Sequence, residues 1–162
     1  MLRRCVRSGL CKLLTGWSQV VLRGEAPSPA ELEAHFRHAG ELGIYLHVPF
    51  CRQICAYCPY NKTLYDPELA RRYAGAVLRE IAFYAPLVGK RPVKSLYLGG
   101  GTPTTMLADG LDRILDRLHA TFDLRCDIPM ESHPHDLTAG KLQAIAALGV
   151  RHLSTGVEAL QD

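Results

Sequence analysis

Three cysteines are the residues of this chain with the clearest capacity for chemistry. Cys51, Cys55 and Cys58 form a C-x3-C-x2-C triplet directly after a short apolar segment. Three thiolates can bind three irons of a [4Fe–4S] cluster, whereas a cluster that only transfers electrons normally has four cysteine ligands. The fourth iron then stays open to a small molecule, by the same logic that separates catalytic from structural metal sites. The triplet therefore predicts a reactive cluster site.

Two other kinds of metal site compete with this interpretation. A zinc-structured interaction module could complete the triplet with one histidine from elsewhere in the chain: His47, His133 or His135. Zinc motifs, however, typically pair a C-x2-C unit with a distant second pair. A ferredoxin-type cluster would need a fourth cysteine, and Cys126 is remote in sequence. The open cluster is the favoured interpretation, and the zinc module is kept as an alternative.

Strand and helix patterns alternate around the triplet. The predicted strands are Gly43–Val48, Val93–Leu98, Cys126–Glu131 and His152–Val157. Three amphipathic helices are predicted between them, because apolar residues recur there at helical spacing. Strand–helix alternation of this kind indicates βαβ units and a parallel sheet.

Two of these helices carry start or stop signals. The first is predicted to have Asp66 as its N-cap and Pro67 at its first position. Its expected apolar face is Leu69, Tyr73, Val77, Ile81 and Tyr84. The third follows Thr138 as a cap and stops at Gly149. The apolar face expected there is Leu142, Ile145 and Ala146.

Each predicted strand alternates apolar with polar residues. In the first strand, Tyr45 and His47 lie between apolar neighbours. Parallel sheets that are buried on both faces read instead as continuous apolar runs. A polar face repeated in four strands therefore predicts a curved sheet that lines a wet, functional interior. Closed (β/α)₈ barrels have about 250 residues, so the 162 residues of this chain predict an α/β fold with a partial barrel of parallel strands, truncated after the fourth strand.

Composition limits the class of protein. The chain is 48% hydrophobic and 22% charged, as expected of a soluble globular protein, and no apolar run approaches the ~20 residues that cross a bilayer. The net charge of +3 and scattered basic residues give no support for nucleic-acid binding. There is no secretory signal pattern, so we interpret Cys5, Cys11 and Cys126 as ordinary free cysteines. A cytoplasmic protein with no membrane or nucleic-acid partner is expected.

The chain is expected to have two parts, 1–42 and 43–162. Residues 1–24 contain five basic residues and no acid. That composition resembles an organellar transit segment, but a basic amphipathic lead-in helix is favoured because serine is sparse. Ala26–Pro29 is interpreted as a linker, and residues 43–162 as the N-terminal half of a core domain.

Four sequence blocks resemble the radical S-adenosylmethionine (SAM) superfamily, and look most like its branch of oxygen-independent coproporphyrinogen III dehydrogenases. The blocks are YLHVPFC at 45–51 with the triplet, LYLGGGTPT at 96–104, ESHP at 131–134 and LGVRHLSTGVE at 148–158. The resemblance runs from about Gly43 to the C-terminus and implies the N-terminal part of a radical SAM core.

The resemblance also implies roles for single residues. In the family, the glycine-rich loop contacts the methionine part of SAM, which places Gly100, Gly101 and Thr102 in the SAM site. Glycine there permits close backbone approach to a ligand. Glu131 matches an acidic residue expected to help hold SAM. Tyr57 and Glu158 are further cofactor-binding candidates, although relatives usually have Gln where Glu158 stands, and a carboxylate lacks the two N–H donors of an amide. Tyr45 and His47 are candidates for the catalytic pocket.

The implied function is reductive cleavage of SAM by a [4Fe–4S] cluster. The resulting 5′-deoxyadenosyl radical would abstract hydrogen from a tetrapyrrole or another organic substrate. The expected partners are that small molecule, an electron donor such as flavodoxin or ferredoxin, and a complementing C-terminal half. Coproporphyrinogen-type members have a further cysteine soon after the triplet, where this chain continues with Pro59-Tyr60. A non-catalytic relative that binds or delivers haem is the alternative.

Overall fold

The computed structural model describes residues 27–157. The chain divides into two compact units, Met1–His35 and Phe36–Asp162. The predicted lead-in helix, Cys5 and Cys11 lie outside the described residues. Among the described helices, none combines the length and apolar character needed to span a bilayer.

The first described helix, α2, spans Pro29–Arg37 and so begins inside the predicted linker. Its start follows from a capping box. The Ser28 hydroxyl accepts a hydrogen bond from the Glu31 backbone N–H at 3.3 Å, and the Ser28 N–H donates to the Glu31 carboxylate at 2.9 Å. Pro29 occupies the first helical position, where its missing N–H costs nothing.

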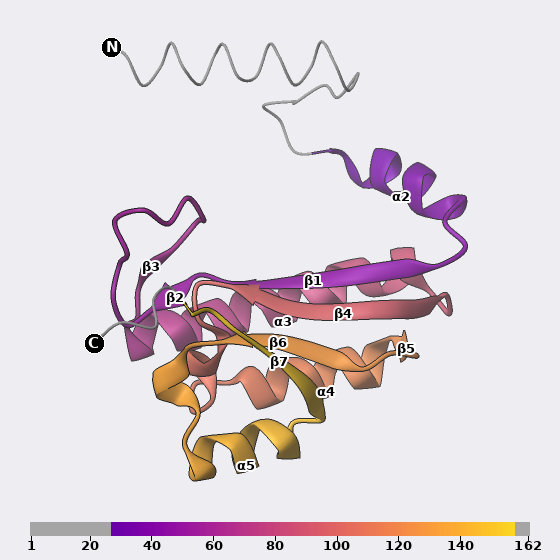
Figure 1. Cartoon of the computed structure of the whole chain (residues 1–162). Coiled ribbons are helices and arrows are strands. Elements are labelled where there is room, and N and C mark those ends of the chain that lie inside the picture. Colours follow the sequence, from indigo (N-terminus) through magenta and orange to yellow (C-terminus); the bar gives the residue numbers. More distant parts are fainter. Residues whose placement is uncertain (1–26, 158–162) are drawn as a thin grey trace, which may run out of the picture. The chain divides into compact units, whose positions relative to one another are not determined.

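Five parallel strands form the main sheet of the second unit (Figure 1). Four of them follow the order β1-β4-β6-β7, and β5 pairs with the start of β4. The bounds are β1 Leu42–Val48, β4 Pro92–Gly100, β5 Asp123–Leu124, β6 Ile128–Ser132 and β7 Val150–Thr155. The parallel α/β class is thus confirmed. The predicted fourth strand was placed too late: β7 ends at Thr155, and Val157 is 63% exposed.

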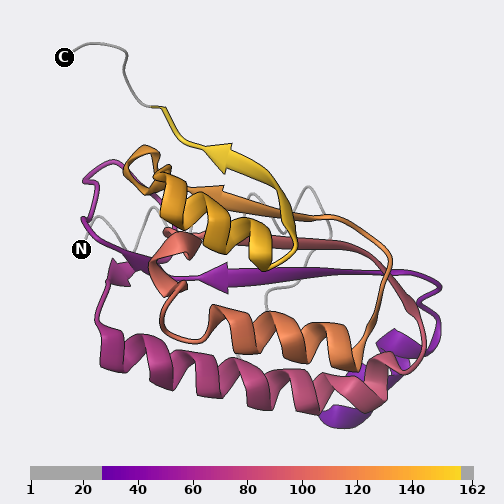
Figure 2. The ribbon, with the colours of Figure 1, turned by 90° about the horizontal axis from the view of Figure 1, so that it is seen from below.

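Three helices cover one face of this sheet, as Figures 1 and 2 show. They are α3 Pro67–Val88, α4 Leu111–Thr121 and α5 Ala139–Ala147. Asp66 caps α3 as predicted, because its carboxylate accepts a hydrogen bond from the Leu69 N–H at 2.7 Å. Thr138 stands at the N-cap position of α5, but its side chain makes no capping hydrogen bond. Two 3-10 turns, η1 Pro103–Met106 and η2 Pro134–Asp136, follow β4 and β6.

The predicted helix faces are confirmed to different degrees: fully for α4, partly for α3 and least for α5. In α3, alanines share the buried face with Val77 and Ile81, while Leu69 is 40% exposed. In α4, the apolar residues at helical spacing are buried: Leu111, Ile114, Leu115 and Leu118. In α5, Ile145 is the single buried residue of the helix, which packs chiefly on β7.

The strands alternate as the sequence predicts. Leu46 is buried on the helix side and lies opposite Leu98, while Tyr45 lies opposite Tyr97 on the other face. Full burial of such an apolar side chain contributes about 1.5–3 kcal/mol, so the register is strongly specified: a one-residue shift would exchange the two faces. The polar residues of β1, β4 and β6 therefore share one face of the sheet.

Candidate functional site

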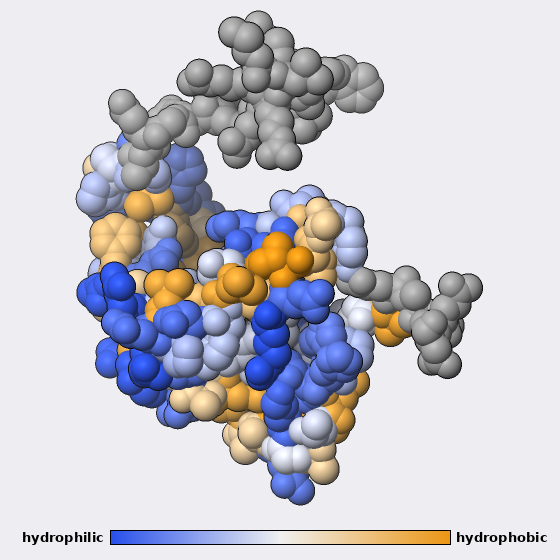
Figure 3. All heavy atoms as spheres, turned by 90° about the vertical axis from the view of Figure 1, so that its left-hand side faces the viewer, coloured by the Kyte–Doolittle hydropathy of each residue, from blue (hydrophilic) through white to orange (hydrophobic). Residues whose placement is uncertain are grey.

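The cysteine triplet lies at the edge where the parallel strands end. Cys51 belongs to β2 (Phe50–Cys51), which pairs with β3 (Thr63–Leu64). The Thr63 N–H donates to the Pro49 carbonyl, and the Tyr65 N–H donates to the Cys51 carbonyl, both at 2.8 Å. This short ladder, which the sequence did not predict, closes residues 52–62 into a loop. Figure 3 looks onto this end of the sheet, where hydrophilic and hydrophobic residues lie side by side.

The glycine run packs directly against the cysteine loop. Gly101 donates its N–H to the Val48 carbonyl, and Thr102 donates to the Phe50 carbonyl, each at 2.7 Å. A Cβ on Gly100 would lie 2.7 Å from the Val48 oxygen, and one on Gly101 would lie 2.8 Å from Cys51 Sγ. Gly100 also has a φ of 121°, which side chains disfavour. These glycines are therefore required by the chain's own packing, a reason that differs from the predicted approach to a ligand.

Cys51 is the cysteine with the best-defined surroundings. The Thr102 hydroxyl donates to its Sγ at 3.9 Å. Burial raises the pKa of the Cys51 thiol, and the nearby Cys58 and Cys55 raise it further, while Thr102 and Lys62 act in the opposite direction. Cys55 and Cys58 follow on the same loop, where the Cys58 N–H donates to the Cys55 carbonyl at 3.3 Å.

The donor set of this loop fits an iron–sulfur cluster. Cys51, Cys55 and Cys58 are all free and half-buried. Within residues 27–157, no three His, Cys, Asp or Glu side chains are grouped so as to hold a single metal ion. A cluster makes a different demand, because each thiolate binds a different iron and the sulfurs need not converge on one point. Three half-buried free thiols on one loop are a donor set of this kind.

Glu131 joins the site from β6. Its carboxylate accepts hydrogen bonds from the Gly100 N–H at 2.9 Å and from the Tyr97 hydroxyl at 3.1 Å. Burial raises the pKa of Tyr97, and the hydrogen bond to Glu131 raises it further. A carboxylate has about four acceptor sites, so Glu131 can still accept hydrogen bonds from a ligand. The structure thus brings together the predicted residues Glu131 and Gly100.

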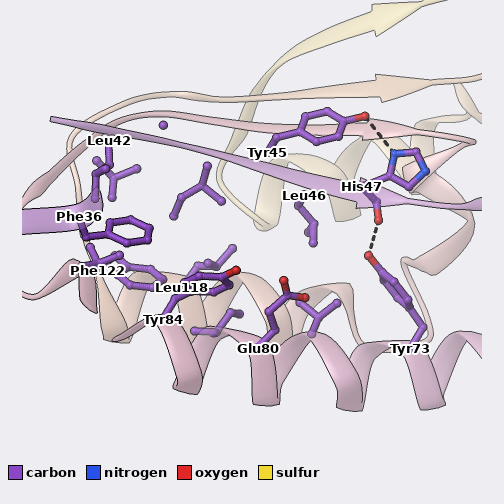
Figure 4. A pocket seen from close by; sticks show the side chains of 16 residues that line it. Phe36, Leu42, Tyr45, Leu46, His47, Tyr73, Glu80, Tyr84, Leu118 and Phe122 are labelled. Atoms are coloured by element: carbon purple, nitrogen blue, oxygen red, sulfur yellow. Dashed lines mark hydrogen bonds between the residues drawn. The ribbon is translucent and has the colours of Figure 1, made fainter. Parts of the chain in front are cut away.

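Tyr45 and His47 form a hydrogen-bonded pair on the polar face of β1 (Figure 4). His47 Nε2 is 2.8 Å from the Asn61 carbonyl, an acceptor only, so Nε2 carries a proton. In the neutral ring, Nδ1 then accepts from the Tyr45 hydroxyl at 3.2 Å. The Tyr73 hydroxyl donates to the His47 carbonyl from the helix side. Both ring nitrogens are engaged, and they tie β1 to the loop that follows the third cysteine.

A cavity on the helix side of the sheet is not part of this site. It has a volume of about 350 Å³ and lies between β1 and helices α3 and α4. Figure 4 shows Leu46 directed toward it, whereas the rings of Tyr45 and His47 lie on the other side of the strand. Its lining is mainly apolar. The chemistry therefore belongs to the polar face and the carboxyl edge of the sheet.

Other candidates lie apart from this constellation. Tyr57 is 66% exposed and makes no hydrogen bond or ring contact within the described chain. His133 and His135 are exposed at η2 and contact each other edge to face, with ring centroids 4.9 Å apart. Glu158 lies outside the described residues.

Two buried carboxylates were missed from the sequence. Asp109 and Asp136 are 7% and 2% exposed, and they lie on either side of η1. Tyr65 donates to Asp109, and Thr104 donates to Asp136. Neither aspartate stands in a motif, so only its burial marks it. Tyr97 was also missed, but the sequence contains a signal for it. It alternates with apolar residues of the strand, so it belongs to the polar face, and it stands next to the glycine run.

The comparisons with known proteins agree with this geometry. The profile of the Radical SAM superfamily matches residues 45–162. This chain belongs to the radical SAM superfamily. Membership implies a [4Fe–4S] cluster and SAM in general. A solved structure of coproporphyrinogen III oxidase (HemN) from Escherichia coli, described as a radical SAM enzyme, superposes with a TM-score of 0.76 at 30% identity, over 83% of this chain and 32% of that chain.

Curated relatives of this radical SAM chain differ in their stated functions. The heme chaperone HemW of Bacillus subtilis (strain 168) is 32% identical over 73% of this chain and 32% of its own length. Oxygen-independent coproporphyrinogen III oxidase of Escherichia coli (strain K12) is 34% identical over 72% of this chain and 26% of its own length. Anaerobilin synthase of Escherichia coli O157:H7 is 30% identical over 74% of this chain and 28% of its own length.

Two facts follow from these matches. The chain resembles HemN over 83% of its length, which confirms the predicted branch and the radical SAM core fold. It spans about a third or less of the length of these relatives. The relatives include an oxidase, a synthase and a chaperone, so the match supports an enzyme-like class and does not choose one reaction.

Proposed function

We propose that Cys51, Cys55 and Cys58 hold a [4Fe–4S] cluster whose open iron takes SAM, and that the chain acts on a tetrapyrrole. One observation carries the proposal: residues from three separate strands meet at the carboxyl edge of the sheet. The Thr102 hydroxyl reaches Cys51 Sγ, and the Gly100 N–H reaches Glu131. The cluster loop, the glycine run and the end of β6 thus form one continuous site.

The residues of this site would divide the work. Cys51, Cys55 and Cys58 would hold the cluster, which would supply the electron for reductive cleavage of SAM and so the chemistry that removes hydrogen from substrate. Gly100, Gly101 and Thr102 would shape the backbone wall against the methionine part of SAM. Glu131, fixed by its bonds to Tyr97 and Gly100, would accept from the SAM amino group. Tyr57 would contact SAM from the cysteine loop, and its exposed ring is free to do so.

Tyr45 and His47 take a positioning role in this proposal. Both ring nitrogens of His47 bond within the chain, so the ring orients Asn61 and with it the loop after the third cysteine. The Tyr45 side chain is 58% exposed on the polar face and can also contact substrate. Burial raises the pKa of Tyr45, with a further contribution from Glu131, so the hydroxyl is a neutral donor at physiological pH.

The partners follow from the same chemistry. An external donor such as flavodoxin or ferredoxin would reduce the cluster. The substrate would be a tetrapyrrole, because the relatives are named for coproporphyrinogen, for anaerobilin and for heme.

Anaerobic reconstitution with iron and sulfide tests the proposal. We expect an iron–sulfur absorption and, after reduction, an electron paramagnetic resonance signal that changes when SAM is added. Serine at Cys51, Cys55 or Cys58 should abolish the cluster, since the hydroxyl is a poor iron ligand. Cys126→Ser is the matched control, because Cys126 is also free and half-buried but precedes β6 at the opposite edge. An iron content unaffected by the triplet variants would refute the assignment.

A second function has a specific observation in its favour, the match to a heme chaperone. In that case the chain would bind haem without cleaving SAM. Two assays separate the possibilities: 5′-deoxyadenosine formation with dithionite and SAM, and a haem titration followed by absorbance. Haem binding without 5′-deoxyadenosine formation would favour the carrier function.

A further inference from the structure

Two buried aspartates, Asp109 and Asp136, each form an ion pair with an exposed arginine, and the two pairs differ in geometry and in charge balance. At Asp109, Arg71 Nη1 donates a hydrogen bond to the carboxylate at 3.0 Å, and the Tyr65 hydroxyl donates to its other oxygen. One cation thus faces one carboxylate, and the Arg71 side chain, although 59% exposed, is already engaged.

At Asp136 the charges do not balance. Lys141 forms a hydrogen-bonded ion pair with Asp136 Oδ1, and the Thr104 hydroxyl donates to Oδ2. Burial would raise the pKa of Asp136, but Lys141, Thr104 and the charge of Arg52 lower it overall, so the carboxylate is ionised. Arg52 is a second cation on the same oxygen, with its Nε 3.8 Å away. Two cations facing one carboxylate leave an excess of one positive charge.

That excess lies on the cysteine loop. Arg52 stands between Cys51 and Cys55, and its side chain is 57% exposed. Its distance to Asp136 is beyond hydrogen-bonding range. The guanidinium makes no hydrogen bond within the described chain, so five N–H donors are available. Asp136 attracts Arg52 through Nε, the nearest nitrogen of the guanidinium. The two terminal nitrogens of Arg52 remain available to a ligand.

Neighbouring groups favour the same kind of ligand. The turn that holds Asp136 also carries His133, whose Nδ1 accepts the His135 N–H at 3.3 Å. In the neutral ring this leaves Nε2 of His133 as a donor. On the cysteine loop, Ile54 and Tyr60 expose 42% and 67% of their surfaces. A ligand with an anionic group and a broad apolar body matches these features.

We infer that Arg52 is a substrate contact that binds a carboxylate of the tetrapyrrole, with Asp136 and Lys141 as its positioning residues. The inference rests on the proposed function. A guanidinium binds a carboxylate through two parallel N–H···O bonds, which a lysine cannot reproduce. Arg71 is the matched comparison, because its Nη1 is already hydrogen-bonded to Asp109.

The test compares an acid with its ester. Coproporphyrin III carries four carboxylates, and its tetramethyl ester has the same macrocycle without the charges. Each is titrated into the reconstituted protein and followed by porphyrin fluorescence. The wild type should prefer the acid, and Arg52→Gln should lose about tenfold or more of that preference, as expected for a charge-assisted hydrogen bond. Arg52→Lys should retain part of it, and Arg71→Gln should retain all of it.

The opposing outcomes are equally definite. An unchanged preference in Arg52→Gln, an equal loss in Arg71→Gln, or a wild type without preference would overturn the inference. A fall in SAM affinity with an unchanged acid preference would instead place Arg52 on the carboxylate of SAM and also overturn it. Binding requires no turnover, so a protein that fails to cleave SAM still reports on Arg52. Urea unfolding checks that both glutamine variants are folded, and Arg71→Gln should be the less stable of the two, because it removes the cation that faces Asp109 while Lys141 remains on Asp136.

Discussion

The two edges of one sheet carry charges in opposite ways. At the amino edge, pairs such as Lys94–Glu41 at 3.6 Å and His152–Asp127 at 3.4 Å have side chains that are 47–70% exposed. At the carboxyl edge, the side chains of Asp109 and Asp136 are 6% and 3% exposed. Each accepts a hydrogen bond from a hydroxyl group and forms an ion pair with a basic side chain. The exposed pairs at the amino edge contribute little to the structure. The buried carboxylates at the carboxyl edge hold separate backbone segments together.

Backbone proximity shows the same contrast. At the carboxyl edge, a Cβ on any of the three consecutive glycines would meet another atom within about 3 Å. Farther from the site, Gly140 and Gly149 would meet nothing within 4 Å. Close packing is thus concentrated where the cluster loop, the glycine run and Glu131 meet. Such preorganisation is what a site needs to hold ligands in fixed geometry.

The largest expected effect is from Gly100→Ala. The new Cβ would lie 2.7 Å from the Val48 carbonyl oxygen, and the φ of 121° is strained for alanine. Backbone strain and overpacking each cost roughly 1–3 kcal/mol, so the free energy of unfolding should fall by about 3 kcal/mol. Urea denaturation measures it. Gly140→Ala, in the open surroundings of α5, should cause no loss; equal stabilities for the two variants would contradict the contrast.

Asp136→Asn should have the next largest effect. It removes the charge that Lys141 and Arg52 face and weakens the bond to Thr104. Breaking a fully buried pair costs about 3–5 kcal/mol, and a loss of about 2–3 kcal/mol is expected here because both cations can reach solvent. Asp109→Asn, with one cation, should lose less. The opposite ranking would break the proposed difference between the two carboxylates.

The same variant has a defined pH dependence. The folded-state pKa of Asp136 is lowered, below an unfolded value of about 3.9. Its contribution is therefore fully present above about pH 4 and is lost as the pH falls through the folded pKa. The stability difference between wild type and Asp136→Asn should be constant from pH 7 to pH 5 and shrink below pH 4. A difference that grows with acid would show that the carboxylate is not stabilised in its charged form.

The sequence predicted residues in local motifs better than residues whose burial depends on distant parts of the chain, and the reason is physical. Cys51, Gly100 and Glu131 stand in local motifs at strand ends, and parallel strands bring their carboxyl ends together. Asp136 was missed because its burial depends on Thr104 and Lys141, which lie in other elements. The apolar face of α5 was wrong in part for a similar reason: helical spacing predicts that Leu142 and Ile145 share a face, but burial depends on what packs there, and Leu142 is 38% exposed.

The smallest effect is expected at the amino edge, from Lys94→Ala. Its ion pair with Glu41 spans 3.6 Å between side chains that are 47% and 66% exposed. Exposed pairs contribute about 0–1 kcal/mol and are screened by salt, so the change in unfolding free energy should be near the error of a urea titration and should vanish at high ionic strength. Lys141→Ala provides the comparison, since Lys141 is 33% exposed and pairs with a buried carboxylate. Equal losses of unfolding free energy in Lys94→Ala and Lys141→Ala would show that burial of the partner does not determine the strength of an ion pair. The proposed difference between the two edges would then be wrong.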